Sequence, residues 1–209
     1  SIPGPISKSF RNLGYVHIPN VFSVKDIETI EKYVNEIEQW PQSHTKWIHS
    51  YEETLSENTI KSRTEFFIGY HSELANIILS GPIPQTVSET IEKDVLLFKE
   101  KINYKFPESE GYTAHQDAPA YRQVKDVTTC ILPIDDANIE SGCIEFVPGS
   151  HKYGLLPTLP GGTLNESLAR QIIPDFEWKP LEVSKGDLVI FSSYTVHKSE
   201  KNTSRTPRR

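Results

Sequence analysis

Residues 112–117 read Tyr-Thr-Ala-His-Gln-Asp and follow a glycine-containing loop at 107–111. We expect this segment to be extended, and alternate side chains of an extended segment point to the same side. His115 and Asp117 would then direct an imidazole and a carboxylate toward one point. These are two candidate metal ligands, and the remainder of the chain has to supply any further ligand.

Short apolar runs separated by turn signals surround this segment. Turns are indicated by Asp135-Asp136, Ser141-Gly142, Pro148-Gly149 and Lys185-Gly186-Asp187. The strand candidates between them are residues 95–98, 101–106, 112–117, 127–133, 143–147, 181–183 and 188–191. Many short strands after a helical region predict a mainly β protein with flanking α-helices, in the form of a sandwich or barrel.

The N-terminal part has helical periodicity. A short strand is predicted within residues 13–22, and Ser23 is a candidate N-cap with Asp26 three residues later. Apolar residues then recur at helical spacing: Ile27, Ile30, Val34 and Ile37. Further helices are predicted at about 71–80 and 84–92. Residues 41–64 are polar without periodicity, so we expect a surface loop or a lid there.

The composition limits the possible classes of protein. The chain has 209 residues, a net charge of −6 and a pI of about 5.7. One domain over 1–209 is expected, and this charge argues against nucleic-acid binding. No apolar run reaches the length of a membrane span. Cys130 and Cys143 form no CxxC pair, which favours a reducing, cytoplasmic location. Because the chain contains no methionine, we expect that residues are missing from it.

His197 is the best-placed candidate for a third metal ligand. It follows the apolar run 188–191 at some distance in the sequence from the first pair. Two histidines and one carboxylate leave positions on the metal open, which is the arrangement of non-haem Fe(II) oxygenases. A His-x-Asp triplet alone is also frequent by chance. The other histidines are expected at the surface or in local hydrogen bonds: His17, His44, His49, His71 and His151.

Several ordered motifs resemble the phytanoyl-CoA dioxygenase (PhyH) family of Fe(II)/2-oxoglutarate oxygenases. They cover most of the chain after about residue 95. They are Leu-Phe-Lys-Glu-Lys-Ile-Asn-Tyr-Lys at 97–105, His-Gln-Asp at 115–117, Ile-Asp-Asp-Ala-Asn at 134–138, Ser-Gly-Cys-Ile-Glu-Phe-Val-Pro-Gly-Ser-His at 141–151, Gly-Asp at 186–187, and the segment from His197 to Arg209.

The resemblance implies a double-stranded β-helix, or jelly roll, at about 94–209 with helical support at about 1–93. It implies an iron ion held by His115, Asp117 and His197, and 2-oxoglutarate chelating that iron through its C1 carboxylate and keto oxygen. O₂ is the further cosubstrate, and ascorbate is expected to help in vitro. Arg208 matches the arginine that binds the C5 carboxylate, because a guanidinium can pair with it in bidentate fashion.

Ser199 matches a position that often adds a hydroxyl contact to the cosubstrate. Lys101 and Arg63 fall near positions where relatives contact it. Arg205 and Arg209 are expected to be mostly solvated. Since relatives continue into another strand near Arg208, we expect this arginine to be poorly held in the sequence as it stands.

The resemblance also bears on the reaction. Halogenating relatives have a small residue in place of the carboxylate ligand, so Asp117 favours hydroxylation. The candidate substrate contacts are polar and partly cationic, which suits a small anionic substrate; they are Asn103, Lys105, Gln116, Tyr121 and Arg122. The motifs at 97–105 and 115–117 look most like bacterial members, including the 2-aminoethylphosphonate hydroxylases.

Two alternatives remain open on the sequence. An acyl-CoA or secondary-metabolite hydroxylase would have the same iron site and a different substrate pocket. A non-catalytic jelly-roll domain that binds a metal or ligand, of the cupin or lectin kind, would not consume 2-oxoglutarate. The sequence leaves the oligomeric state open.

Overall fold

A computed structural model describes residues 4–124 and 126–209. The helices are α1 (Pro5–Leu13), α2 (Val24–Glu38), α3 (Ser72–Leu79), α4 (Pro82–Ile91) and α5 (Glu166–Ile172), with 3₁₀ helices η1 (Ile68–Tyr70), η2 (Ala118–Tyr121) and η3 (Ser150–Tyr153). The strands are β1 (Tyr15–Ile18), β2 (Ile48–Glu53), β3 (Thr59–Glu65), β4 (Lys101–Asn103), β5 (Tyr112–His115), β6 (Thr128–Ile131), β7 (Ile144–Phe146), β8 (Lys179–Pro180), β9 (Leu188–Ser192) and β10 (His197–Ser199). None of the described helices is long and apolar enough to cross a membrane.

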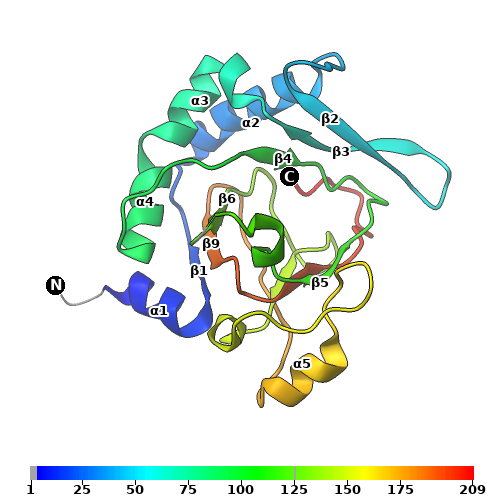
Figure 1. Ribbon diagram of the computed structural model, residues 1–209. Helices are drawn as coiled ribbons and strands as arrows, with labels where there is room; N and C mark the ends of the chain where they lie inside the picture. The colour runs from blue at the N-terminus through cyan, green and yellow to red at the C-terminus, as the bar shows by residue number, and fades with distance from the viewer. Residues whose placement is uncertain (1–3, 125) are drawn as a thin grey trace.

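The strands form three sheets, in the orders β1-β9-β6, β5-β10-β7-β8 and β2-β3-β4. All the ladders among them are antiparallel. Figure 1 shows α2 and α3 on one side of β4, with β5, β6 and β9 on the other. The predicted mainly β fold with flanking helices is confirmed.

Strand β9 is the most deeply buried strand of the first sheet. Leu188, Val189, Ile190 and Phe191 are at most 4% exposed. β9 pairs with β6 on one side and with β1 on the other, where Val16 lies opposite Ile190. The predicted strand within 13–22 is therefore present. The first 93 residues were expected to provide helical support, and they also contribute strands to the sheets.

Helix α2 begins as the sequence predicts. The Ser23 hydroxyl accepts a hydrogen bond of 3.1 Å from the backbone N–H of Asp26, which satisfies one of the helix's unpaired N-terminal donors. The apolar stripe of the helix is buried: Ile27, Ile30, Val34 and Ile37. This stripe packs on Ile102 and Tyr104, so α2 covers one face of the β2-β3-β4 sheet.

Three of the local predictions are wrong. The strand predicted at 181–183 lies earlier, as β8, and Val183 forms only an isolated bridge to Ala137. Residues 41–64 are not irregular, because β2 and β3 pair as an antiparallel hairpin in which the buried pair His49–Thr64 shares a 2.7 Å hydrogen bond. Polar composition hid this hairpin, since most of its other side chains are partly or fully exposed. Residues 95–98 form no strand, and Leu96 is 97% exposed. An apolar run without a neighbouring strand does not form a ladder.

The packing of α2 generates a stability prediction. Ile37 is completely buried, so Ile37→Ala removes apolar burial and leaves a cavity that should cost about 2–5 kcal/mol of unfolding free energy. Val24→Ala on the same helix, at a side chain that is 70% exposed, should change it by less than about 0.5 kcal/mol. Urea unfolding of both variants measures the difference, and equal effects would contradict the described burial.

Candidate metal centre

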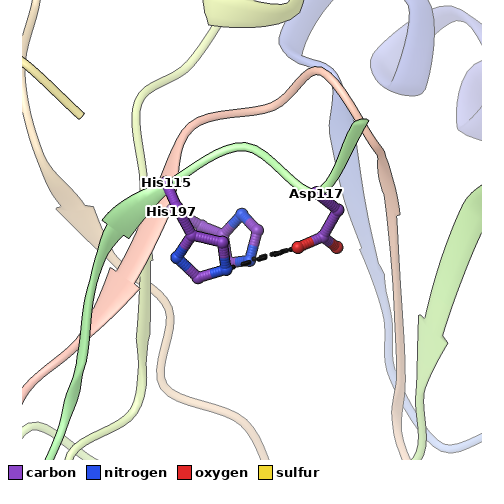
Figure 2. A group of neighbouring side chains, drawn as sticks. All are labelled: His115, Asp117 and His197. Atoms are coloured by element: carbon purple, nitrogen blue, oxygen red, sulfur yellow. Dashed lines mark ion pairs between the residues drawn. The ribbon is translucent and has the colours of Figure 1, made fainter. Parts of the chain in front are cut away.

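His115, Asp117 and His197 lie together at one end of adjacent strands. β5 and β10 are antiparallel neighbours, and His115 lies directly opposite His197. Asp117 Oδ1 is 3.3 Å from His115 Nε2 and 3.5 Å from His197 Nε2. One potential ligand atom from each residue lies within 4.8 Å of the others. Figure 2 shows the three side chains pointing toward one another.

Hydrogen bonds set the orientation of both imidazoles. His115 Nδ1 donates to the Thr113 carbonyl at 2.6 Å, and His197 Nδ1 donates to the Thr195 carbonyl at 2.9 Å. With its one proton on Nδ1, each neutral ring would present the lone pair of Nε2 to a metal ion in the place of the proton that faces Asp117. Outer-shell bonds of this kind select the tautomer of metal-binding histidines. The donor set of two neutral imidazoles and one carboxylate fits Fe(II).

The protonation of the cluster also favours a cation. Burial lowers the pKa of His197 to about 4, so its ring is neutral near pH 7. Burial would raise the pKa of Asp117, but its hydrogen bond with His115, and the positive charge of His197 when that ring is protonated, lower it overall. Burial would lower the pKa of His115, and its hydrogen bonds to Asp117 and the Thr113 carbonyl raise it instead. A divalent ion would replace the shared proton between His115 and Asp117.

Gln116 does not face the cluster, although it lies between two of its members. Its amide nitrogen donates to the carbonyls of Gly154 at 2.9 Å and Tyr194 at 2.8 Å, and its amide oxygen accepts from Leu156 N–H at 2.9 Å. These bonds anchor the segment from the side opposite to the metal ligands. Asp117 itself lies just past β5, in a helical conformation (φ −76°, ψ −28°) that begins η2.

Two buried cations lie next to the cluster, beyond Ser199. Lys105 Nζ donates to Ser199 Oγ at 2.9 Å and to the Gly142 carbonyl at 3.0 Å. Arg208 Nη2 donates to the same Gly142 carbonyl at 2.7 Å, and its buried Nε has no hydrogen-bond partner among the described residues. Neither cation is ion-paired to a carboxylate in the described chain. Burial and the charge of Arg208 lower the pKa of Lys105 to about 7.

The backbone holds Arg208 firmly, contrary to our expectation. Arg208 N–H donates to the Lys105 carbonyl at 2.9 Å, and Lys105 N–H donates back to the Arg208 carbonyl at 3.3 Å. The prediction of a solvated Arg209 is also wrong. Its side chain is 8% exposed and pairs with Asp135 at 2.9 Å and Glu31 at 3.3 Å. These acidic partners come from distant segments, so the local sequence did not reveal them. Arg205 is exposed, as predicted.

The remaining candidate residues lie on β3, on β4 and in or just after η2. Arg63 and Asn103 are direct cross-strand partners on β3 and β4, and Lys101 lies opposite Glu65. Tyr121 ends η2 and packs edge-on against Phe98, with ring centroids 5.6 Å apart. Arg122 follows and is exposed.

Sequence reasoning missed two residues of the site. Thr129 Oγ1 lies 3.4 Å from Asp117 Oδ2 and donates to it. Gly142 accepts from both buried cations and has φ +76°. A Cβ at Gly142 would lie 2.7 Å from Lys105 Nζ and closer still to the Glu200 carbonyl oxygen. The turn signal Ser141-Gly142 was visible in the sequence, but its proximity to two cations was not.

Comparison with known proteins identifies the family. The model of the family described as phytanoyl-CoA dioxygenase (PhyH) matches residues 10–209. The chain belongs to the PhyH family. The predicted class of enzyme is thereby confirmed: the chain is an Fe(II)- and 2-oxoglutarate-dependent dioxygenase, and the non-catalytic alternative is not supported.

Two curated PhyH-like relatives are similar over nearly the whole chain. Methylphosphonate hydroxylase of Gimesia maris is 36% identical over 196 residues, covering 94% of this chain and 74% of the relative. A 2-aminoethylphosphonate dioxygenase of an uncultured bacterium is 35% identical over 204 residues, covering 96% and 76%. The crystal structure of EctD from S. alaskensis with 2-oxoglutarate and 5-hydroxyectoine shares the fold. Its TM-score is 0.82 at 14% identity, covering 99% of this chain and 73% of that one.

The geometry of the three ligands generates a prediction about metal binding. Loss of an outer-shell partner of a metal ligand weakens metal binding by roughly 10- to 100-fold. Loss of a ligand itself should weaken Fe(II) binding by more than that, in each of the variants His115→Ala, Asp117→Ala and His197→Ala. Anaerobic equilibrium dialysis with Fe(II) measures this. His44→Ala, at an exposed histidine, is the control and should bind as the wild type does. Wild-type affinity in His197→Ala would show that the cluster is not the metal site.

Proposed function

We propose that this enzyme hydroxylates a small organophosphonate of the aminoalkyl- or alkylphosphonate class. 2-Oxoglutarate and O₂ are consumed, and succinate and CO₂ are released. The observation that carries the proposal is the joint presence of a two-histidine, one-carboxylate cluster and a polar, cation-rich surrounding. The two curated relatives that are 35–36% identical, a methylphosphonate hydroxylase and a 2-aminoethylphosphonate dioxygenase, support the substrate class.

The β strands support assignment of the core as a double-stranded β-helix. The three-stranded sheet β1-β9-β6 and the four-stranded sheet β5-β10-β7-β8 would be its two layers. Aromatic contacts join the two sheets, since the ring of Phe146 on β7 lies 5.2 Å from Phe191 on β9. In this jelly roll the metal cluster belongs to one end of the strand pair β5–β10.

His115, Asp117 and His197 would hold Fe(II), and the pair Lys105–Arg208 would hold the C5 carboxylate of 2-oxoglutarate. The unpartnered Arg208 Nε, together with Lys105 Nζ and Ser199 Oγ, offers donors to one anion. Buried cations without a counter-ion are costly, and a bound carboxylate would compensate them. Iron with 2-oxoglutarate and O₂ supplies the oxidising equivalents for inserting a hydroxyl group into a C–H bond.

The chain's own residues orient the reactants and limit access of water. Gln116 ties the segment carrying His115 and Asp117 to two distant loops, which keeps both ligands in register. Thr129 holds Asp117 Oδ2, leaving Oδ1 directed at the two imidazoles. Because a carboxylate occupies the third ligand position, halide has no space there, and hydroxylation is the expected outcome.

Substrate contacts are part of the proposal. Asn103, Tyr121 and Arg122 remain candidates. The contacts of Lys105 favour the cosubstrate instead, and the amide of Gln116 is used by backbone groups. A free-thiol pair, Cys130 and Cys143, is compatible with a cytoplasmic enzyme.

A substrate screen tests the proposed function. With Fe(II), 2-oxoglutarate and ascorbate, succinate release should rise several-fold above the substrate-free rate with methylphosphonate or 2-aminoethylphosphonate. Acyl-CoA esters and amino acids should leave it near the background. Phosphorus NMR of the product distinguishes hydroxylation from uncoupled turnover. Stimulation by an acyl-CoA ester and not by any phosphonate would favour the alternative substrate class.

The low pKa of Lys105 generates a prediction about pH. The free enzyme loses the Lys105 proton near pH 7, and a bound carboxylate favours the charged form. Affinity for 2-oxoglutarate should therefore fall as pH rises above 7, by up to about tenfold per pH unit. Anaerobic titration of the Fe(II) enzyme, followed by visible absorption, measures this from pH 6.5 to 8.5.

Two variants separate Lys105 from its neighbour. Lys105→Met should bind 2-oxoglutarate more weakly at pH 7 and lose the pH dependence. Arg208→Ala should weaken binding at every pH, because an arginine stays charged throughout this range. A wild-type affinity that is constant between pH 6.5 and 8.5 would contradict the role of Lys105.

A further inference from the structure

A second group of polar and cationic side chains lies on one face of β3 and β4. Arg63 lies directly opposite Asn103, and Glu65 directly opposite Lys101. Directly opposed residues of an antiparallel pair project to the same face of the sheet. These four side chains therefore share one face. The intervening residue pair, Thr64 and Ile102, projects to the opposite face.

The opposite face is the one covered by α2. Thr64, Ile102 and Tyr104 are at most 8% exposed, and the last two pack in the apolar cluster of that helix. The polar face consequently looks toward the strands that carry the metal cluster, on the side of β4 away from α2 and α3 (Figure 1). Continuing the alternation from Lys101 and Asn103 leads to Lys105, whose Nζ contacts Ser199 beside the metal ligands. The polar row thus runs along the edge of the site.

Polar atoms in this row lack partners. Asn103 Oδ1 is buried without a hydrogen-bond partner among the described residues, and the buried Arg63 Nε makes no hydrogen bond there beyond an ion-pair contact with Glu65 Oε2 at 3.2 Å. The Arg63 side chain as a whole is 40% exposed, so its guanidinium is not enclosed by this ion pair. The amide of Asn103 can turn over to present its N–H₂ group as a donor. Buried polar groups without partners are uncommon in proteins and are often completed by a ligand.

The charge of Lys101 is influenced both by this group and by Asp117. Burial lowers the pKa of Lys101, and the positive charge of Arg63 lowers it further, while the negative charges of Asp117 and Glu65 act in the opposite direction. The positive charge of Lys99 also lowers the pKa of Lys101, by less than that of Arg63 does. An anion bound by Lys101 and Arg63 would lie on the face of β4 that is turned toward β5, as the strand register and Figure 1 indicate.

The cosubstrate does not carry enough negative charge to bind this group as well. 2-Oxoglutarate has two carboxylates. The metal would bind one, and the pair Lys105–Arg208 with Ser199 would bind the other. Arg63 and Lys101 are then left with Glu65 and Asp117 as nearby carboxylates, and Asp117 would be used by the metal. A further anion is needed to balance them, and a phosphonate carries up to two negative charges.

We propose that Arg63, Lys101 and Asn103 form the binding site for the phosphonate group of the substrate. This inference rests on the proposed function, and it assigns Arg63 and Lys101 to the substrate in place of the cosubstrate. The guanidinium pairs with two phosphonate oxygens, the ammonium with the third, which lies nearest the metal, and the amide donates to one of the two oxygens that the guanidinium binds. The alkyl carbon next to phosphorus is thereby directed toward the metal.

Binding measurements without O₂ test the assignment. Calorimetry gives the dissociation constant of methylphosphonate for the Fe(II) enzyme saturated with 2-oxoglutarate, and visible absorption gives that of 2-oxoglutarate. Arg63→Gln and Lys101→Gln should each weaken methylphosphonate binding by about 10- to 100-fold, as loss of a charge-assisted hydrogen bond does. Binding of 2-oxoglutarate should change by less than about threefold, which also shows that the fold and the metal centre are intact.

Matched control variants show whether the effect depends on where the removed positive charge lies. Arg170→Gln also removes an arginine that is ion-paired to a glutamate, on the surface helix α5, and Lys25→Gln removes an exposed lysine of α2. Both should bind methylphosphonate as the wild type does. Lys101→Arg should retain most of the affinity that Lys101→Gln loses.

The possible outcomes are distinct. Weaker 2-oxoglutarate binding with unchanged methylphosphonate binding in Arg63→Gln and Lys101→Gln would overturn the assignment and return both residues to the cosubstrate. Unchanged binding of both ligands would overturn it as well, while leaving the proposed function intact. If the wild-type enzyme bound 2-oxoglutarate and neither bound nor hydroxylated any phosphonate, the proposed function itself would fail, and this assignment with it.

Discussion

The site depends on the pairing of β10 with β5. This ladder places His197 opposite His115, although they are far apart in the sequence, and places Ser199 opposite Tyr112. On its other edge, β10 pairs with β7, where His197 lies opposite Phe146. A strand paired on both edges has little freedom to shift. Both imidazoles are therefore held at a fixed separation, and their Nδ1 atoms are tied to carbonyls two residues earlier.

Uncompensated positive charge is the second feature of the site. Lys105 and Arg208 share the Gly142 carbonyl, and Arg63 and Lys101 have Glu65 as their nearby acid. The chain as a whole is acidic, with a net charge of −6. Cations are thus concentrated where two anionic reactants are proposed to bind. Lys101 and Asn103 of the proposed substrate site and Lys105 of the proposed cosubstrate site follow one another in a single polar row that begins on β4. The two proposed sites are therefore only a few residues apart along this segment.

Much of this organisation was predictable from local patterns. The N-cap at Ser23 and the helical repeat to Ile37 predicted α2, and turn signals around short apolar runs predicted most strands. The β2–β3 hairpin was not predictable, because its buried pair His49 and Thr64 is polar and resembles loop sequence. Arg209 was also misjudged, since its partners Glu31 and Asp135 approach only through tertiary structure.

The sequence by itself determined the identity of the chemistry. His115, Asp117 and His197, together with the ordered motifs that followed, were sufficient to indicate the ligand set and the family, because ligand type and spacing are local properties. Tertiary structure alone decided which partners each cation has. Lys101, Asn103 and Lys105 alternate along one short segment, but cross-strand pairing sets Lys105 beside Arg208 and sets Lys101 and Asn103 beside β3. Side chains that are equivalent in sequence acquire different partners, since their environment comes from strands distant in the chain.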